Sequence, residues 1–389
     1  MGVRQRLTAL SLRRVHVLVV EVPGWFSTRV AAQQQLSARG WGEASSPADA
    51  DVLLVCGAPG ERLEAAVQQV WCQLPGPRAR EWAETPADVA DALDRAVAVL
   101  ADTEQQRRDA GERHQRDDGP DEHGNEDASQ DSHEMSDMDH GDMDHGDMEM
   151  APGGIPLAGG GEDRDGLEMD VLQVPLGPVL PCWPAGLVLR CSLQGDVVVA
   201  AEVEVMPAGS TPPALDLSPE TVAARLCDQA RQVLELSGWV SAAQQAGRVG
   251  EDLLTGAEAA ACLTRLRRLT ARVERSRLLR WSLRDLGRSS AAHGCAEGPP
   301  VRPVGDVHDR LLSFLRSAGD LLDERPDDEP HHRPADQMEA WSRWTGTDPH
   351  ELPEMVTGLD LAAVRLVVAS AAPHTATAGT SVTAEVSGG

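Results

Sequence analysis

The chain has 389 residues with 62 acidic and 35 basic side chains, a net charge of −27 at pH 7 and a pI of about 4.7. Such a balance argues against a nucleic-acid-binding protein, because phosphate recognition needs a basic surface. Every basic residue is arginine and tyrosine is absent, so chemistry based on a P-loop lysine, a Schiff-base lysine or a tyrosine acid is excluded.

The seven cysteines are scattered and include no CxxC pair. This pattern favours reduced thiols over a disulfide framework, a zinc site or an iron–sulfur site. Arg13 and Arg14 interrupt the apolar residues near the N-terminus, so we expect no secretory signal. No run reaches the ~18 apolar residues that a membrane helix needs. We therefore expect a cytoplasmic protein that has no membrane span of its own.

The length predicts two domains with a linker between them. Residues 1–100 alternate between apolar strand patterns and amphipathic helix patterns. We expect strands at 15–20 and 51–56, and helices at 29–39, from Pro59 onwards and at 88–100. This alternation predicts right-handed βαβ units in an α/β domain. The expected sheet is parallel, truncated and flavodoxin-like.

Residues 101–166 are expected to form a disordered acidic linker rich in Asp, His and Met. Residues 101–150 hold 18 acidic residues and four arginines, and such a segment cannot bury enough apolar surface to offset its ordering entropy. Thioethers and imidazoles are ligands for copper, and imidazoles also suit nickel and zinc. The candidate metal ligands are His133, His140, His145, Met138, Met143 and Met148. A solvated tether and a weak metal site both stay open.

Residues 167–370 are expected to form an α+β domain, a β-hairpin followed by a helix bundle, with a flexible tail at 371–389. The hairpin strands lie at 187–193 and 197–205, and the helices at 218–236, 257–286, 306–322 and 359–369. Glu274 with Arg277 and Asp306 with Arg310 have the spacing of helix ion pairs. We interpret His308, beside Asp306 and Asp309, as a solvated helical histidine; a proton-relay role is the alternative.

The first half resembles the small iron–sulfur subunit of NADH:quinone oxidoreductase (respiratory complex I) and of nickel–iron hydrogenases. The similarity covers about residues 13–80, through Ser46-Pro-Ala-Asp-Ala-Asp-Val-Leu-Leu-Val-Cys-Gly57 and Val70-Trp-Cys-Gln-Leu-Pro-Gly-Pro-Arg78. The resemblance implies cluster-binding cysteines after the first strand, but the matching residues 24–29 include no thiol. It also implies four interface candidates: Pro47, Asp51, Gly57 and Pro75.

The second half resembles the large, quinone-site subunit of the same enzymes. Leu176-Gly-Pro-Val-Leu-Pro181 is similar to the Leu-Gly-Pro-x-His-Pro motif of that family, and Leu180 stands where the family has its quinone-site histidine. Gly305-Asp306 with Arg310 matches a second motif. The CxxC pairs that hold nickel in hydrogenases are missing. Gly177, Pro178 and Pro181 complete the interface candidates.

The resemblance therefore implies a cofactor-less fusion of the two subunits, which lacks iron–sulfur and nickel ligands and is inactive alone. We expect a redox-inactive, structural subunit of a complex-I-like or hydrogenase-like, ion-translocating membrane assembly. Its partners would be integral-membrane proton-channel or antiporter-like subunits, which would hold it at the inner face of the membrane, and its two domains would dock on each other. A working subunit that uses the cofactors of its partners to pass electrons to quinone, or a copper-binding protein, are the alternatives.

Overall fold

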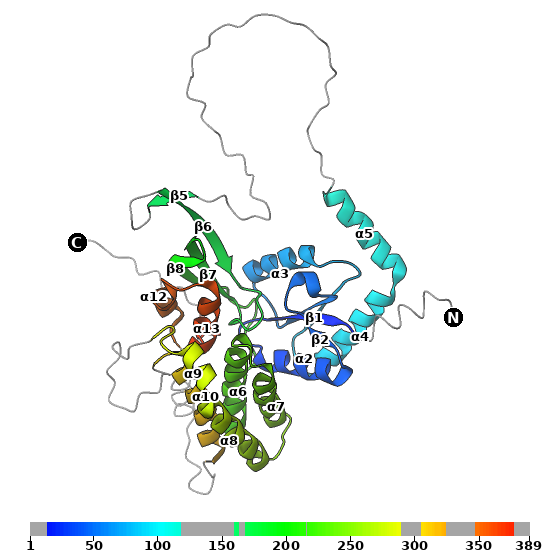
Figure 1. Cartoon of the computed structure of the whole chain (residues 1–389). Helices are drawn as coiled ribbons and strands as arrows, with labels where there is room; N and C mark the ends of the chain where they lie inside the picture. The colour runs from blue at the N-terminus through cyan, green and yellow to red at the C-terminus, as the bar shows by residue number, and fades with distance from the viewer. Residues whose placement is uncertain are drawn as a thin grey trace, which may run out of the picture.

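The computed structural model describes residues 14–117, 159–162, 168–214, 216–288, 305–323 and 347–376. Two parts lie against each other, a parallel sheet with its helices and a helical part that carries an antiparallel sheet (Figure 1). The candidate metal ligands between His133 and Met148, and most of the tail after residue 371, lie outside the described residues. Among the described helices, none combines the length and the apolar character needed to cross a bilayer.

The first half is a four-stranded parallel sheet in the order β2-β1-β3-β4. Its elements are β1 (His16–Glu21), α2 (Phe26–Arg39), β2 (Gly42–Glu43), the 3-10 helix η1 (Pro47–Asp49), β3 (Val52–Cys56), α3 (Glu61–Gln73), β4 (Ala79–Ala83), α4 (Asp88–Ala101) and α5 (Thr103–Asp117). The α/β architecture expected from the sequence is present.

The two faces of this sheet bury alternate residues of the same strands, as a strand period of two requires. Val52, Leu54 and Cys56 of β3 point to the face that α2 and α4 cover. Leu53 and Val55 point to the face that α3 covers, where Val188 and Met206 of the second half complete the core. The central strand β3 is buried along its whole length, which explains its continuous apolar sequence.

Two elements of the first half correct the sequence analysis. Residues after Arg78 form the strand β4, where the sequence indicated no strand between the helix that begins at Pro59 and the helix at 88–100. Helix α5 occupies residues that were assigned to the linker. Its Asp109 carboxylate accepts hydrogen bonds of 2.8 and 3.0 Å from the buried Arg78 guanidinium, and Gln106 bonds to the Arg78 backbone. These contacts fix the helix to the sheet and explain why an acidic sequence is folded there.

The second half begins with an antiparallel sheet in the order β5-β6-β7-β8. The strands are β5 (Gly159–Glu162), β6 (Glu168–Leu176), β7 (Leu187–Gln194) and β8 (Val197–Val205); the helices are α6 (Pro219–Leu236), α7 (Val240–Leu254), α8 (Ala259–Arg275), α9 (Arg277–Leu283), α10 (Val307–Asp323), the 3-10 helix η3 (Pro349–Glu351), α12 (Leu352–Val356) and α13 (Leu361–Ala371). The expected hairpin is β7–β8, and β5 and β6 extend it.

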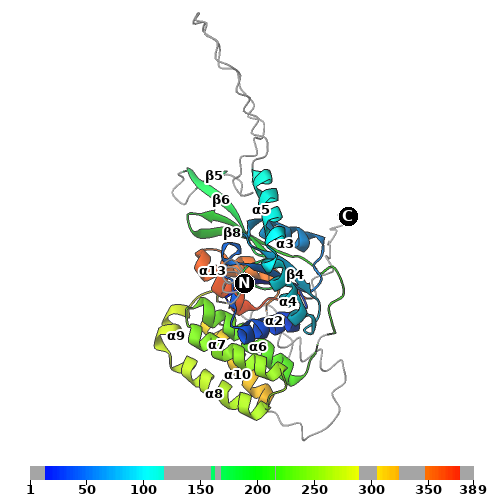
Figure 2. The same cartoon turned by 90° about the vertical axis from the view of Figure 1, so that its right-hand side faces the viewer.

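Helix α6 lies at the centre of the helical part and packs against α7, α10 and α13. Helix α7 was not predicted from the sequence, and one helix was expected across 257–286. The structure divides that segment at Ser276, whose hydroxyl oxygen accepts the backbone N–H of Leu279 and starts α9. Helix α2 of the first half lies beside α6 and α7 (Figures 1 and 2), so this helix joins the two parts.

Candidate interdomain site

The two halves meet at the carboxyl ends of strands β1 and β3. The segment after β3 forms an antiparallel bridge between Pro59 and Ala208, and Gly209 N–H donates a 2.9 Å hydrogen bond to the carbonyl of Ala58. In a doubly wound sheet, this edge is where ligands bind. Here it is covered by the chain that follows β8 and by the segment between β6 and β7.

Two glycines show how closely the backbones approach at this junction. Gly24 has φ +96°, and a Cβ atom built on it would lie 2.5 Å from the Cβ atom of Pro212. A Cβ atom on Gly209 would lie 2.4 Å from the carbonyl oxygen of Pro59. Such distances leave no room for a side chain, so the docked arrangement depends on glycine at both positions.

A network of buried charges links the halves. The Arg29 guanidinium of α2 donates hydrogen bonds of 2.6 and 3.1 Å to the two carboxylate oxygens of Asp228 on α6. Its Nε donates to Glu21 at the end of β1, at 2.6 Å. Arg29 and Asp228 are 7% and 8% exposed, respectively. A forked arginine–carboxylate pair of this kind fixes orientation as well as distance.

The Asp228 carboxylate is fully used as an acceptor. Besides the two bonds from Arg29, it accepts 2.9 Å bonds from Arg231 Nε and Gln232 Nε2 on its own helix. Burial alone would raise the pKa of Asp228, but the positive charges of Arg29 and Arg231 outweigh it and hold the pKa well below its ordinary value. Burial also opposes the charge of Arg29, but Asp228 and Glu21 raise the pKa of its guanidinium. Both groups are therefore charged over the physiological pH range.

Aromatic and amide contacts extend the same interface. The Arg225 guanidinium of α6 lies 4.3 Å from the ring centroid of Phe26, the first residue of α2. Gln34 of α2 donates a 3.2 Å hydrogen bond to the carbonyl of Glu251 on α7. On the other side of the sheet, Arg62 of α3 forms an ion pair with Glu204 of β8. The halves thus interact through charged, aromatic and backbone contacts at once.

A small cavity of about 50 Å³ lies beside the network. Arg29, Glu21 and Arg231 line it from one side, and the segment from Pro178 to Trp183 lines it from the other. The volume holds a few water molecules and is far smaller than the several hundred Å³ typical of small-molecule sites. Leu180, at the position of the quinone-site histidine in the resembled family, is one of the lining residues.

We tested whether the residues at this junction fit an iron–sulfur cluster. Trp25 and Phe26 fill the position of the family's cysteine loop and are 4% and 5% exposed. Among the described residues, three thiols border the network: Cys56, opposite Glu21 in the sheet, Cys182, on the cavity wall, and Cys227, which precedes Asp228 and is buried in the helical core. Burial raises the pKa of all three thiols, that of Cys182 and that of Cys227 to about 12. A cluster needs several grouped thiolates, so these residues do not fit one.

The structure separates the seven interface candidates into two groups. Gly57 lies at the end of β3 with φ +113° against Trp25, and Pro178 and Pro181 line the cavity, with Gly177 beside them. The other three lie at or before the amino ends of strands, away from the junction. Asp51 accepts the backbone N–H of His16, Pro47 starts η1, and Pro75 is exposed before β4. These three residues shape the sheet domain itself.

The charge network between the halves was not predicted from the sequence. Arg29 and Asp228 are 199 residues apart, so no local pattern predicts that they pair with each other. One signal of a functional residue was the position of Arg29. It follows a buried strand, in the segment where the resembled family has its cysteine-bearing loop. Asp228 carried a second signal, because it lies within the otherwise apolar face of α6.

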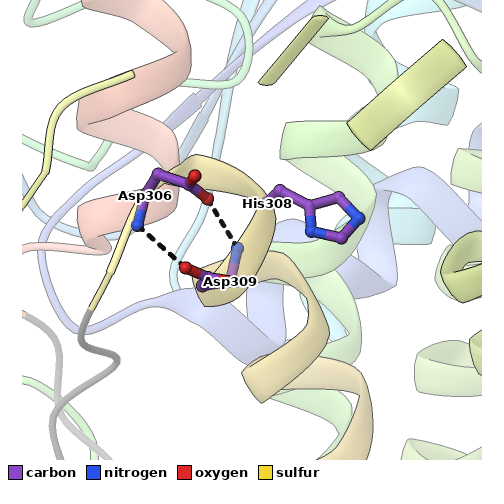
Figure 3. Close-up of side chains that lie close together, drawn as sticks. All are labelled: Asp306, His308 and Asp309. Carbon is purple, nitrogen blue, oxygen red and sulfur yellow. Dashed lines mark hydrogen bonds between the residues drawn. The ribbon is translucent and has the colours of Figure 1, made fainter. Parts of the chain in front are cut away.

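A second cluster of polar side chains, Asp306, His308 and Asp309, lies at the start of α10 (Figure 3). Asp309 N–H donates a 3.0 Å bond to Asp306, and Asp306 N–H donates a 3.4 Å bond to Asp309. The other Asp306 oxygen accepts the backbone N–H of Asp285. This reciprocal pattern is a helix capping box, and it explains the two carboxylates without a bound ion.

His308 and Arg310 differ from their sequence-based interpretation. His308 is 4% exposed rather than solvated, and a nitrogen of its ring lies within 4.8 Å of an oxygen of each carboxylate. Burial lowers the pKa of His308, and the charge of Arg280 acts in the same direction. The Arg310 guanidinium is fully buried and donates to the carbonyls of Gly287 and Gly305 and to Ser370. Glu274 pairs with Arg316 at 2.7 Å, not with Arg277.

Compared with models of known protein families, the chain matches none of them. No curated protein is significantly similar to it.

Proposed function

We propose that the chain is a redox-inactive structural subunit of a complex-I-like or hydrogenase-like membrane assembly. In this proposal it joins a small-subunit-like half and a large-subunit-like half into one unit. The electron-transfer chemistry of the resembled family is absent, and the unit binds integral-membrane proton-channel or antiporter-like subunits. The observation that carries the proposal is the buried pair of Arg29 and Asp228 at the junction of the halves.

The topology of the first half supports this interpretation. The parallel order β2-β1-β3-β4 corresponds to the first strands of a flavodoxin-like sheet, which has the order 2-1-3-4-5. The ligand edge of such a sheet lies at the carboxyl ends of its strands. In this chain, the segment with the Leu-Gly-Pro-x-x-Pro motif covers that edge, a contact that supports the face-to-face packing of the two halves that the resemblance implies.

The chemistry of the junction supports a structural role. A redox site needs ligands for its cofactor and space for its substrate, and here the space is taken by Trp25, Phe26 and the charge network. Removing one partner of a buried ion pair is strongly destabilising, because the other charge stays buried without compensation. The network therefore favours one docked arrangement of the halves over an open one.

The proposal is tested by purifying the tagged full-length chain from membranes of its native host in mild detergent. We expect multi-spanning proton-channel or antiporter-like subunits to copurify in fixed proportion. Asp228→Ala should lose these partners, because it disrupts the docked unit that they bind. Asp323→Ala, which removes an exposed carboxylate paired with Arg267, should keep them. A chain recovered without membrane proteins, or partners retained equally by Asp228→Ala, would refute the proposal.

A further inference from the structure

An exposed apolar pair on helix α9 stands out from the rest of the molecule. Leu278 and Trp281 are 75% and 74% exposed, the highest values for large apolar side chains among the described residues. They are three positions apart, so they share one face of the helix. Leu279 and Leu283, buried at 5% and 1%, form the opposite face and fix α9 to the helical core. The exposed pair is therefore held outward by packing on its other side.

The surroundings of this pair are strongly basic, in contrast to the chain as a whole. Residues 265–288 include nine arginines and two acidic residues, a net charge of +7 in a chain of −27. Both acidic residues already have arginine partners: Glu274 bonds to Arg316, and Asp285 lies 2.7 Å from Arg288 and 3.1 Å from Arg284. Two of the nine arginines, Arg265 and Arg267, pair with Asp252 and Asp323 outside the segment, and the others leave it with an excess of positive charge.

Three arginines next to the apolar pair have no acidic partner within the described residues: Arg275, Arg277 and Arg280. All three are exposed. Among the described residues, Arg275 donates to the carbonyl of Ala271, at 2.8 Å. We call these three residues, with Leu278 and Trp281, the α9 surface. It lies on the outer margin of the helical half, while α8 runs along the lower edge (Figure 2).

We propose that the α9 surface binds directly to an anionic membrane surface. A tryptophan and a leucine surrounded by arginines are the composition of helices that lie in the membrane interface, with the apolar groups among the acyl chains and the charges at the headgroups. Uncompensated arginine charges are complementary to anionic lipid headgroups. An acidic peptide would explain the arginines, but it would leave the exposed tryptophan and leucine without a function.

The distribution of charge makes this contact compatible with an acidic protein. At physiological ionic strength, charges further away than about 8 Å are largely screened. An anionic surface at α9 therefore interacts mainly with the local excess of arginine. Two apolar side chains and a few charges give a reversible attachment, weaker than any membrane span. Such contact would orient the chain on the membrane with α9 facing the lipid.

The inference is independent of the proposed function, because lipid vesicles alone test it. The purified full-length chain is floated with vesicles of phosphatidylcholine, with and without about 30 mol% phosphatidylglycerol. We expect flotation only with the anionic vesicles, and less of it when the salt concentration is raised. The variant R275Q/R277Q/R280Q should partition about 100-fold more weakly, since each basic residue near such a surface contributes about fivefold. L278S/W281S should also lose flotation.

Matched controls separate the α9 surface from general charge effects. R107Q/R108Q/R248Q removes three exposed arginines elsewhere, and V240S/V199S removes two other exposed apolar side chains. Both controls should float as the parent chain does. Absence of flotation with anionic vesicles, equal flotation with neutral vesicles, or equal losses in the controls would overturn the proposal. The proposal would also be overturned if the chain did not bind vesicles but bound a synthetic peptide of residues 118–150 through the same arginines.

Discussion

Replacing Asp228 with alanine removes the centre of the charge network between the halves. The carboxylate accepts four hydrogen bonds, two of them from Arg29 across the junction. Without it, Arg29 keeps Glu21 and Arg231 keeps Glu235, but the buried guanidinium of Arg29 and the half-buried guanidinium of Arg231 lose their shared partner. Breaking a buried pair in this way costs about 3–5 kcal/mol. We expect the affinity between the halves to fall by about 100-fold to several-thousand-fold.

The assay cuts the chain without removing any part of it. A protease site placed between residues 118 and 158 allows the linker to be cleaved in the folded protein, which abolishes the effective concentration that the linker provides. Sedimentation or gel filtration over a dilution series then gives the Kd between the two halves. We expect the parent halves to stay together at micromolar concentration and the Asp228→Ala halves to separate.

Two further variants make the result interpretable. Asp323→Ala removes a carboxylate whose ion pair with Arg267 is exposed on both sides, so the Kd should change by less than about fivefold. Arg29→Met, on the other half, should weaken association in the same way as Asp228→Ala, and the circular dichroism of each half should be unchanged. A Kd for Asp228→Ala within about threefold of the parent value would refute the reasoning.

Two further predictions concern one backbone position and one buried histidine. Gly24→Ala should weaken association of the cleaved halves in the same assay, because the added Cβ meets Pro212 and the residue has φ +96°; an unchanged Kd would show that the junction can open without cost. Burial lowers the pKa of His308 from its ordinary 6.5, so the folded chain binds fewer protons there than the unfolded chain. Stability should therefore fall as the pH falls through about 6.5 toward the lowered pKa, and His308→Leu should reduce this slope in urea unfolding. Since the pKa of His374 is also lowered by burial, part of the slope should remain; an unaltered slope would contradict the assignment to His308.

The α/β character of the first half was predictable because its signals are local. The continuous apolar runs of β1 and β3 and the helix patterns between them fix a parallel arrangement. Strand β4 was missed because Ala79-Arg-Glu-Trp-Ala83 has little apolar sequence of its own. It becomes a strand by pairing with β3 at the sheet edge, a contact that the sequence alone does not show.

The candidate site was only partly predictable. The motif residues Gly57, Gly177, Pro178 and Pro181 could be selected by resemblance, and they lie at the junction. The charged pair at the junction could not be predicted, because the partner of Arg29 is distant in the chain. His308 was misjudged for a related reason. A histidine at the start of an amphipathic helix is exposed or buried according to what packs on it, and here it lies in the interior of the helical half.

The central claim, that the junction has a structural rather than a redox role, is tested most directly by metal analysis. The full-length chain is purified under anaerobic conditions, and iron and acid-labile sulfide are measured per chain. We expect both to lie well below one per chain, because Cys56, Cys182 and Cys227 lie on separate elements and do not supply the four grouped thiolates that a cluster takes. Three or four iron atoms per chain with matching sulfide, lost in a variant with Cys56→Ser, Cys182→Ser and Cys227→Ser, would contradict the account.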